Sequence, residues 1–518
     1  MLSLLSKRNI KVALNSRYFL AFFAGAIYPL GLAPLGWWPI LLISLASLIW
    51  LAYKRTVKQA TWLFYSYGLG FYGVGVSWIH VSIHQFGGAP LALSVVMMLL
   101  FIAFLSLFKA LGGYLLTRFS SGRPAIYYFA GFPVVWLIID LFQASLLTGF
   151  PWLYVGYGLV ESPLSGWISA TGVYGASYFV VLSLSLVLWL YQERNSLSSG
   201  MTLTLAMLIP MVSFFSSFLV NQFASQQTGT KPIEVAILQP NIPQDQKWAK
   251  GKRLGHIKQL DRMYQRVLGA DLIVWPEAAV PAMKHHVDYW IDRWQKLAEE
   301  AGSDVILGIP IMDRDSSIYS SLITLGSQQA RYDKQYLVPF GEFVPFAGLL
   351  RGLIEFFNLP MSSFSAGDAS QPPIALAGLQ VYPAICYEVA YSELFRNFDN
   401  INKNQKDSII VTISNDAWFG ASWGPHQHLQ IAQARALEGG TSLIRATNTG
   451  ISAIIDHQGR LVERLPQFEE VTFFREVELS FATTWFKRYS FWSTFLLVFG
   501  TQLLILISSQ ALSNRKLN

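Results

Sequence analysis

Three polar side chains of complementary chemistry stand beside apolar runs that are typical of buried strands. Glu277 follows the run 272–276, Cys386 follows the run 381–385, and Lys334 lies between them in the sequence. A carboxylate can act as a general base, a thiol as a nucleophile, and an ammonium group as the stabiliser of an oxyanion. Taken singly, Glu277 and Lys334 are more typical of solvated charges or surface ion pairs. Together with the thiol they predict nucleophilic catalysis.

Cys386 is the only cysteine in the chain, which excludes an internal disulfide framework. It stands where the predicted strand gives way to a helical pattern at 391–397. A thiol at the start of a helix faces the positive end of the helix dipole, so we expect a lowered pKa and a reactive thiolate. The alternative is a buried, unreactive cysteine that packs as a small apolar side chain.

The sequence predicts neither a metal site nor a bound cofactor. None of the eight histidines forms an HExxH pattern, and the pairs His285/His286 and His426/His428 have spacings that point the imidazoles apart on a helix. The glycine-rich nucleotide-binding patterns GxGxxG and GxxxxGK[ST] do not occur.

The composition predicts that much of the chain faces lipid. Of its 518 residues, 53% are hydrophobic and only 13% are charged, about half the charged share of a typical soluble protein. Such high hydrophobicity also excludes intrinsic disorder. The net charge of +7 would be compatible with nucleic-acid binding in a soluble protein, so the positions of the basic residues must decide its meaning.

Eight apolar segments are each near the roughly 20 residues that a membrane-spanning helix needs. Seven lie within residues 1–220, and the eighth, at 491–510, precedes a short tail at 511–518. Between them, residues 230–487 carry the charges, turn signals and short strand patterns of a globular domain. The seven N-terminal segments are 18–36, 37–53, 61–80, 90–117, 124–145, 165–191 and 201–220.

Basic residues are confined to alternate connections, as the positive-inside rule requires. They precede the first segment, follow the second, fourth, sixth and eighth, and are missing from the connections at 35–36, 81–89 and 143–165. We therefore expect both termini in the cytoplasm and the globular domain on the opposite side of the membrane. Because the positive charge serves this topology, we expect no binding to nucleic acid.

Within the globular domain, strand and helix patterns alternate, which predicts an α/β layered fold. Several strand candidates are continuous Val/Ile runs, as in strands buried on both faces. The expected strands are 233–239, 271–275, 304–309, 319–325, 380–385, 408–414, 441–446 and 451–456, and the expected helices are 254–267, 287–301 and 426–438.

Three short strings resemble the Glu–Lys–Cys signatures of the nitrilase, or carbon–nitrogen hydrolase, superfamily. They are Trp275-Pro-Glu277, Tyr332-Asp-Lys334 and Ile385-Cys386-Tyr-Glu388. The order of seven spans, a globular domain and an eighth span narrows the resemblance to the apolipoprotein N-acyltransferase family over essentially the full length. Further strings agree with that family, namely Gly149-Phe-Pro-Trp152, Gln239-Pro-Asn-Ile-Pro243, Pro339-Phe-Gly-Glu-Phe-Val-Pro345, Asn415-Asp-Ala-Trp-Phe-Gly420 and Arg445-Ala-Thr-Asn-Thr-Gly450.

The resemblance implies a polytopic protein of the bacterial inner membrane, with eight spans and a periplasmic catalytic domain folded as an α–β–β–α nitrilase-like sandwich. It implies that Cys386 takes an acyl chain from a phospholipid, usually phosphatidylethanolamine, as a thioester. The chain then passes to the N-terminal S-diacylglyceryl cysteine of an apolipoprotein.

The resemblance also implies roles for individual side chains. Glu277 would serve as the base, and Lys334 would stabilise the oxyanions. Glu342 would orient Lys334 or Glu277, and the acyl site would be shaped by Trp248, Tyr387 and Glu388.

An amine outcompetes water for a thioester only where water is scarce, so we expect the site close to the bilayer. The apolar insert 346–361 and the aromatic connection 150–157 are candidates to place it there, the alternative for each being a buried core segment. Two ionisable residues lie within predicted spans. We expect Lys109 to snorkel to the cytoplasmic end, and Asp140 to pair, line a cavity or make a structural hydrogen bond.

Two other functions are compatible with parts of this pattern. A membrane-tethered amidase would use the same three residues with water as the acceptor. A transporter with an external domain would make the three residues coincidental, but it predicts ionisable or broken helices at a midplane site, and the sequence offers little beyond Asp140.

Overall fold

The computed structural model describes residues 16–120, 123–192, 199–225, 229–343, 364–395 and 407–515. They fall into two compact units, which we call the helical unit and the catalytic unit. The helical unit comprises the described parts of Met1–His80, Ala92–Phe223 and Tyr489–Asn518, and the catalytic unit those of Val81–Leu91 and Ala224–Arg488.

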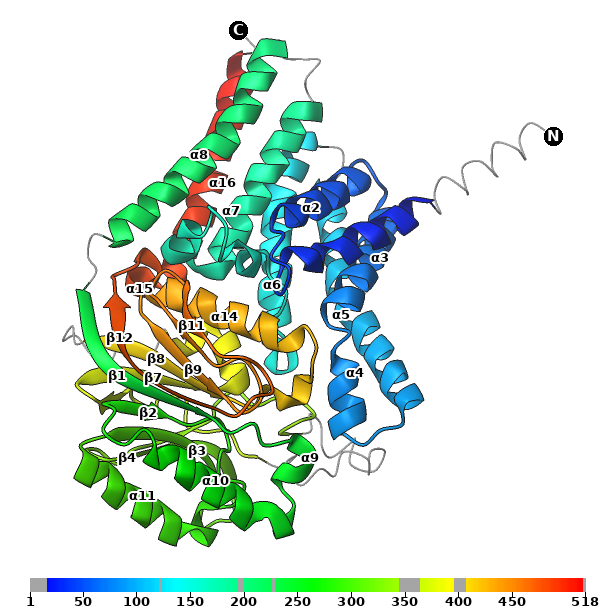
Figure 1. The fold of residues 1–518 in the computed structure, drawn as a ribbon. Helices are drawn as coiled ribbons and strands as arrows, with labels where there is room; N and C mark the ends of the chain where they lie inside the picture. Colours follow the sequence, from blue (N-terminus) through cyan, green and yellow to red (C-terminus); the bar gives the residue numbers. More distant parts are fainter. Residues whose placement is uncertain are drawn as a thin grey trace. The chain divides into compact units, whose positions relative to one another are not determined.

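The helical unit is built from apolar helices (Figure 1). Three of them are long and apolar enough to cross a membrane, namely Leu91–Ser120, Ile126–Thr148 and Gly166–Gln192. Residues 16–27 are also helical. The other elements include η1 (Tyr28–Gly31), α2 (Pro39–Ala52), α3 (Val57–Gly75), α5 (Leu91–Ser120), η3 (Ile126–Gly131), α6 (Phe132–Ser145), η4 (Leu146–Thr148), η5 (Val155–Leu159), α7 (Gly166–Gln192), α8 (Ser199–Ser225) and α16 (Phe491–Arg515).

A buried ion pair joins α5 to α6. The Nζ atom of Lys109 lies 3.2 Å from Oδ1 of Asp140, and both side chains are almost fully enclosed. The ammonium group also lies 4.1 Å from the ring centre of Trp136 and 5.0 Å from that of Phe71. The prediction that Lys109 snorkels is therefore wrong, because a carboxylate and two aromatic faces offset the cost of burying its charge.

The aromatic connection 150–157 is core rather than surface. Trp152, Tyr154 and Tyr157 are all buried, and the hydroxyl of Tyr154 donates to the carbonyl oxygen of Asp140 at 3.0 Å. Of the two alternatives, the buried core segment is correct for this stretch. The second candidate, the insert 346–361, lies outside the described residues.

The catalytic unit is built on two six-stranded sheets. The first has the order β12-β1-β2-β3-β4-β5 and the second β11-β10-β9-β8-β7-β6. Parallel pairing joins β1, β2 and β3 in the first sheet and β7, β8 and β9 in the second. The strands are β1 (Gly229–Gln239), β2 (Leu272–Val274), β3 (Asp304–Met312), β4 (Ile318–Leu325), β5 (Arg331–Asp333), β6 (Ile374–Leu376), β7 (Leu379–Ile385), β8 (Ser408–Ser414), β9 (Leu443–Thr447), β10 (Ala453–Ile455), β11 (Leu461–Arg464) and β12 (Val471–Phe481).

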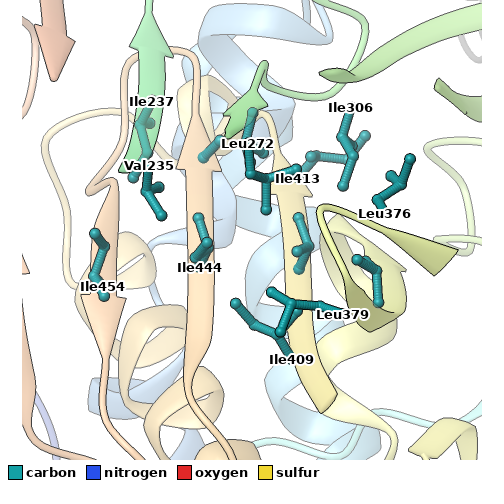
Figure 2. Close-up of a cluster of buried hydrophobic side chains, with 14 of the residues drawn as sticks. Val235, Ile237, Leu272, Ile306, Leu376, Leu379, Ile409, Ile413, Ile444 and Ile454 are labelled. Atoms are coloured by element: carbon teal, nitrogen blue, oxygen red, sulfur yellow. The ribbon is translucent and has the colours of Figure 1, made fainter. Parts of the chain in front are cut away.

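The two sheets stack face to face, with helices on their outer faces (Figure 1). Apolar side chains from both sheets fill the space between them, among them Val235 and Ile306 from the first sheet and Ile409 and Ile444 from the second (Figure 2). A second apolar cluster packs α10 (Arg253–Gln265) and α11 (Asp288–Ala301) on the outer face of the first sheet. Helix α14 (Gly424–Gly439) covers the second sheet, so the predicted α–β–β–α sandwich is confirmed.

All eight predicted strands and all three predicted helices of this unit are present, with boundaries shifted by a few residues. Four strands were not predicted, namely β5, β6, β11 and β12. The first three have only three or four residues each, and in β12 the exposed charged residues Arg475, Glu476 and Glu478 interrupt the apolar pattern.

Candidate active site

The catalytic unit brings the predicted carboxylate and ammonium groups into direct contact. Glu277 follows β2 and Lys334 follows β5, and the Nζ atom of Lys334 lies 3.3 Å from Oε1 of Glu277. The same nitrogen lies 2.7 Å from Oε1 of Glu342. Lys334 is therefore a buried cation held between two carboxylates.

Glu277 is held close to the neighbouring strand by a glycine. A Cβ atom at Gly308, on β3, would lie 2.6 Å from the carbonyl oxygen of Pro276 and 2.7 Å from the Cα atom of Glu277. The amide of Ala279 then donates to the carbonyl oxygen of Gly308 at 3.0 Å. Only glycine permits this approach, which fixes the loop that carries the carboxylate.

The two carboxylates keep Lys334 charged. Burial acts to lower the pKa of Lys334, but Glu277 and Glu342 outweigh it and raise that pKa well above its ordinary value. Glu342 is itself oriented by the amide of Val338, which donates to Oε2 at 2.8 Å. Burial raises the pKa of Glu342, and Lys334 opposes that rise.

Cys386 follows β7 in a strained turn. Its φ angle is 56°, in the left-handed region that non-glycine residues rarely adopt, and such a conformation costs about 1–3 kcal/mol. It begins η9 (Cys386–Ala390), a single turn of 3-10 helix. A sharp turn between strand and helix is a common way to present a nucleophile at the edge of a sheet.

The predicted lowering of the thiol pKa is wrong. Burial and the nearby Glu277 carboxylate raise the pKa of Cys386 to about 12, with Lys334 opposing the rise. A five-residue helix offers a weaker dipole than the longer helix that we expected from the pattern at 391–397. The thiol is thus protonated at neutral pH and needs a base.

Glu388 connects the Lys334 loop to the end of β7. Its fully buried carboxylate accepts hydrogen bonds from the amides of Gln335 at 2.6 Å and Ile385 at 2.7 Å. The hydroxyl of Tyr332 also donates to it, at 3.1 Å. Burial raises the pKa of Glu388 to about 7, although these backbone donors oppose the rise.

A second buried network lies behind the cysteine. The Nε2 atom of His428 lies 3.1 Å from the carbonyl oxygen of Cys386, and its Nδ1 atom lies 2.9 Å from Oδ1 of Asp416. Arg445 donates to the other oxygen of Asp416 at 2.6 Å. Although burial opposes them, Arg445 and His428 hold the pKa of Asp416 well below its ordinary value.

No pattern in the sequence predicted this network. His428 stood out only as one of a histidine pair with His426, and Asp416 and Arg445 only as members of strings that resemble a family. A usable signal was present, because Asp416 closely follows the predicted strand 408–414 and Arg445 lies within the predicted strand 441–446. Carboxyl ends of neighbouring parallel strands meet at one edge of a sheet.

Two further predicted site residues are aromatic. Trp248 follows α9 (Gln244–Lys247), and its indole nitrogen is buried without a hydrogen-bond partner among the residues that the structure describes. Tyr387 packs edge-to-face on Tyr391 at 5.4 Å, and Tyr391 stacks on Tyr336 at 4.2 Å. Within the described ranges, no group of three or more His, Cys, Asp or Glu side chains is arranged to hold a metal ion.

Both parts of the chain match known protein families. Residues 234–487 match the carbon–nitrogen hydrolase family, the class that a Glu–Lys–Cys site on an α–β–β–α sandwich defines. Residues 24–186 match the apolipoprotein N-acyltransferase N-terminal domain.

Full-length relatives narrow the class to one family. The chain is 40% identical to an apolipoprotein N-acyltransferase of Photobacterium profundum over 88% of its length and 87% of that protein's. It is 38% identical to one of Pseudomonas syringae pv. tomato, over 94% of its length and 96% of that protein's. The chain therefore belongs to the apolipoprotein N-acyltransferase family, and it is an acyltransferase.

Proposed function

We propose that the chain N-acylates the N-terminal S-diacylglyceryl cysteine of apolipoproteins with an acyl chain taken from a phospholipid such as phosphatidylethanolamine. Membership of the family supports this acceptor. The observation that carries the chemistry is the buried Lys334 ammonium group, which lies between the Glu277 and Glu342 carboxylates and whose charge acts on the only thiol of the chain.

In the first half-reaction, Glu277 accepts the proton of the Cys386 thiol, and the sulfur attacks the acyl ester carbonyl of the phospholipid. Because the thiol pKa is raised, this proton transfer is part of the barrier and requires a base in contact range. Lys334 and the backbone N–H groups after Cys386 stabilise the tetrahedral oxyanion. The intermediate expels the lysophospholipid alkoxide, which takes the proton from Glu277, and leaves a thioester.

In the second half-reaction, the α-amine of the diacylglyceryl cysteine attacks the thioester carbonyl. Glu277 accepts a proton from the amine and returns it to the departing thiolate of Cys386. Water must be scarce for an amine to win this competition. The amidase alternative lacks support, since the family to which the chain belongs is one of N-acyltransferases.

The supporting residues act at different distances from the chemistry. Glu342 fixes the ammonium of Lys334. Glu388 is fully buried and accepts from the amides of Gln335 and Ile385, so it positions Lys334 and Cys386 through these neighbouring residues rather than contacting an acyl chain. Trp248 and Tyr387 remain the candidates to line the acyl site.

We further propose a multi-pass protein of the bacterial inner membrane. Residues 1–220 would form seven spans, 230–487 the periplasmic catalytic domain, 491–510 the eighth span and 511–518 a cytoplasmic tail. The alternation of basic connections with connections free of Lys and Arg supports this topology. Reporters fused after Val220 should be active only outside the cytoplasm, and a cytoplasmic signal at that junction would overturn the orientation.

The proposed reaction is tested by its products. Reconstituted enzyme with phosphatidylethanolamine vesicles and a diacylglyceryl-cysteine peptide should yield N-acyl peptide and lysophospholipid in equal amounts by mass spectrometry. Glu277→Gln should slow product formation by roughly the 10²–10⁴-fold associated with general base catalysis. Steady release of free fatty acid with the peptide unchanged would instead support the amidase reading.

A further inference from the structure

A second buried lysine lies beside the proposed base. In the described part of the catalytic unit, Lys247 is 1% exposed, as Lys334 is. The Nζ atom of Lys247 donates to the carbonyl oxygen of Glu277 at 3.3 Å. It thus holds the backbone of the residue whose side chain contacts Lys334.

The segment that carries Lys247 is fixed at the carboxyl ends of the central strands. The amide of Ile242 donates to the side chain of Asn448 at 3.0 Å, and the Asn448 side chain donates back to the Ile242 carbonyl at 2.8 Å. Asn415, after β8, donates to Gln244 of α9 at 2.8 Å. These bonds hold α9, which follows β1 of the first sheet, against the ends of β8 and β9 in the second sheet, so Lys247 has little freedom to leave the site.

The charges of the site require a second cation. Lys334 contacts two carboxylates, Glu277 and Glu342, so these three groups carry a net negative charge when all are ionised. A thiolate at Cys386 forms only as Glu277 takes up its proton, which leaves that net charge unchanged. Lys247 balances the excess negative charge before and after the transfer.

Burial lowers the pKa of Lys247 to about 8, while Glu277 and Cys386 oppose the fall. The nearby charge of Asp416, which also acts on the thiol, is paired with Arg445. Lys247 is therefore mostly protonated near neutral pH and loses its proton under mildly alkaline conditions.

We propose that Lys247 is a positioning residue of the acyl transfer, which fixes the Glu277 backbone and supplies the second positive charge that the Cys386 thiolate needs. This inference rests on the proposed roles of Cys386 and Glu277. It adds to them a residue that no sequence motif indicated.

The test uses alkylation of the intact full-length enzyme by iodoacetamide, which reports on the only thiol of the chain and needs no lipid. Lys247→Met should slow alkylation below about pH 8 by at least about tenfold, equivalent to one pKa unit of the thiol. Above that pH the alkylation rates of the variant and the wild type should converge, because Lys247 of the wild type has then lost its charge as well. Lys247→Arg keeps the positive charge, so its alkylation rate should exceed that of the wild type in alkaline solution.

Lys252→Met is the matched control. Lys252 is exposed and donates to Gln246 at 2.6 Å on the same stretch of chain, so this variant should follow the wild-type curve. A loss in Lys247→Met that is equal at every pH, or no loss, would overturn the proposal. If Lys247→Met fails to fold, Lys247→Arg decides the question. An alkylation rate in alkaline solution identical to that of the wild type would then overturn the proposal.

A separate assay of thioester formation from phosphatidylethanolamine distinguishes failure of the proposed function from failure of the proposed role of Lys247. Lys247→Met should form the thioester more slowly than the wild type at neutral pH. If the wild type forms none, the proposed function fails, but the alkylation curves still decide the role of Lys247.

Discussion

His428 holds the carbonyl oxygen of Cys386 through its Nε2 atom at 3.1 Å, although 42 residues separate the two in the sequence. The imidazole is fixed in turn by Asp416, and Asp416 by Arg445. Because Cys386 has a positive φ angle, its backbone needs a restraint from outside the turn. The buried network provides that restraint and keeps the nucleophile in its strained conformation.

Replacing Asp416 should destabilise the catalytic unit. Asp416→Asn leaves Arg445 buried without its carboxylate partner, so we expect a loss of about 3–5 kcal/mol in the free energy of unfolding. Because the pKa of Asp416 is lowered in the folded state, its stabilisation is present above the ordinary Asp value and is lost as pH falls towards the folded-state pKa. The variant should therefore show a flatter acid-unfolding curve.

Asp292→Asn, at an exposed position on α11, is the control for this measurement. Chemical denaturation at neutral pH and in acid compares the two variants. Equal stability of Asp416→Asn and Asp292→Asn would refute a structural role for the network.

The reactivity of Cys386 should report its raised pKa. Since the thiolate is the reactive form and the thiol pKa is about 12, the rate of iodoacetamide alkylation should keep rising into alkaline solution without a plateau near neutral pH. Mass spectrometry of the single cysteine follows the reaction directly. A plateau near neutral pH would contradict this expectation. It would indicate a thiolate already formed in the resting enzyme, as expected if the helix dipole lowered the pKa of the thiol.

Glu388 should be sensitive to loss of its charge. In Glu388→Gln an amide N–H₂ group must face the backbone donors of Gln335 or Ile385, so we expect a loss of about 1–3 kcal/mol in stability. Acylation should slow by more than about tenfold, because the loop of Lys334 and the turn of Cys386 lose their common anchor. Tyr332→Phe removes only a neutral donor and should cost about 1 kcal/mol. Equal effects of the two variants on acylation would contradict this role.

The ion pair of the helical unit should behave as a coupled pair. Lys109→Met leaves a buried, unpaired Asp140 and should lower the free energy of unfolding in mixed micelles by about 3–5 kcal/mol. The double variant Lys109→Met/Asp140→Asn should recover much of that loss, because neither residue is then charged. Strictly additive losses would show that the two side chains do not interact energetically.

Much of the fold followed from the sequence, and the reasons are local. Continuous apolar runs indicated the buried central strands β1, β7 and β8, and amphipathic patterns indicated α10 and α11. The short strand β5 was not indicated, because its three residues, Arg331–Asp333, carry two charges. Its pairing depends on β4, and such tertiary pairing has no signature in a window of the sequence.

The site was predictable in part. The residue types and neighbouring strings of Glu277, Lys334 and Cys386 indicated chemistry, whereas the raised pKa of Cys386 depends on burial, which spacing does not reveal. Lys247 looked like any charged residue of a polar loop until the fold enclosed it. The pairing of Lys109 with Asp140 likewise depends on how two helices face each other.

The central claim is that Cys386 carries the acyl chain, and trapping the thioester tests it most directly. Wild-type enzyme incubated with phosphatidylethanolamine labelled in its acyl chain, and no acceptor peptide, should accumulate label on Cys386 that hydroxylamine releases. Cys386→Ala should accumulate none, and addition of diacylglyceryl-cysteine peptide should discharge the wild-type adduct into N-acyl peptide. Formation of N-acyl peptide by Cys386→Ala, or by wild-type enzyme that never carries label on the thiol, would contradict the account.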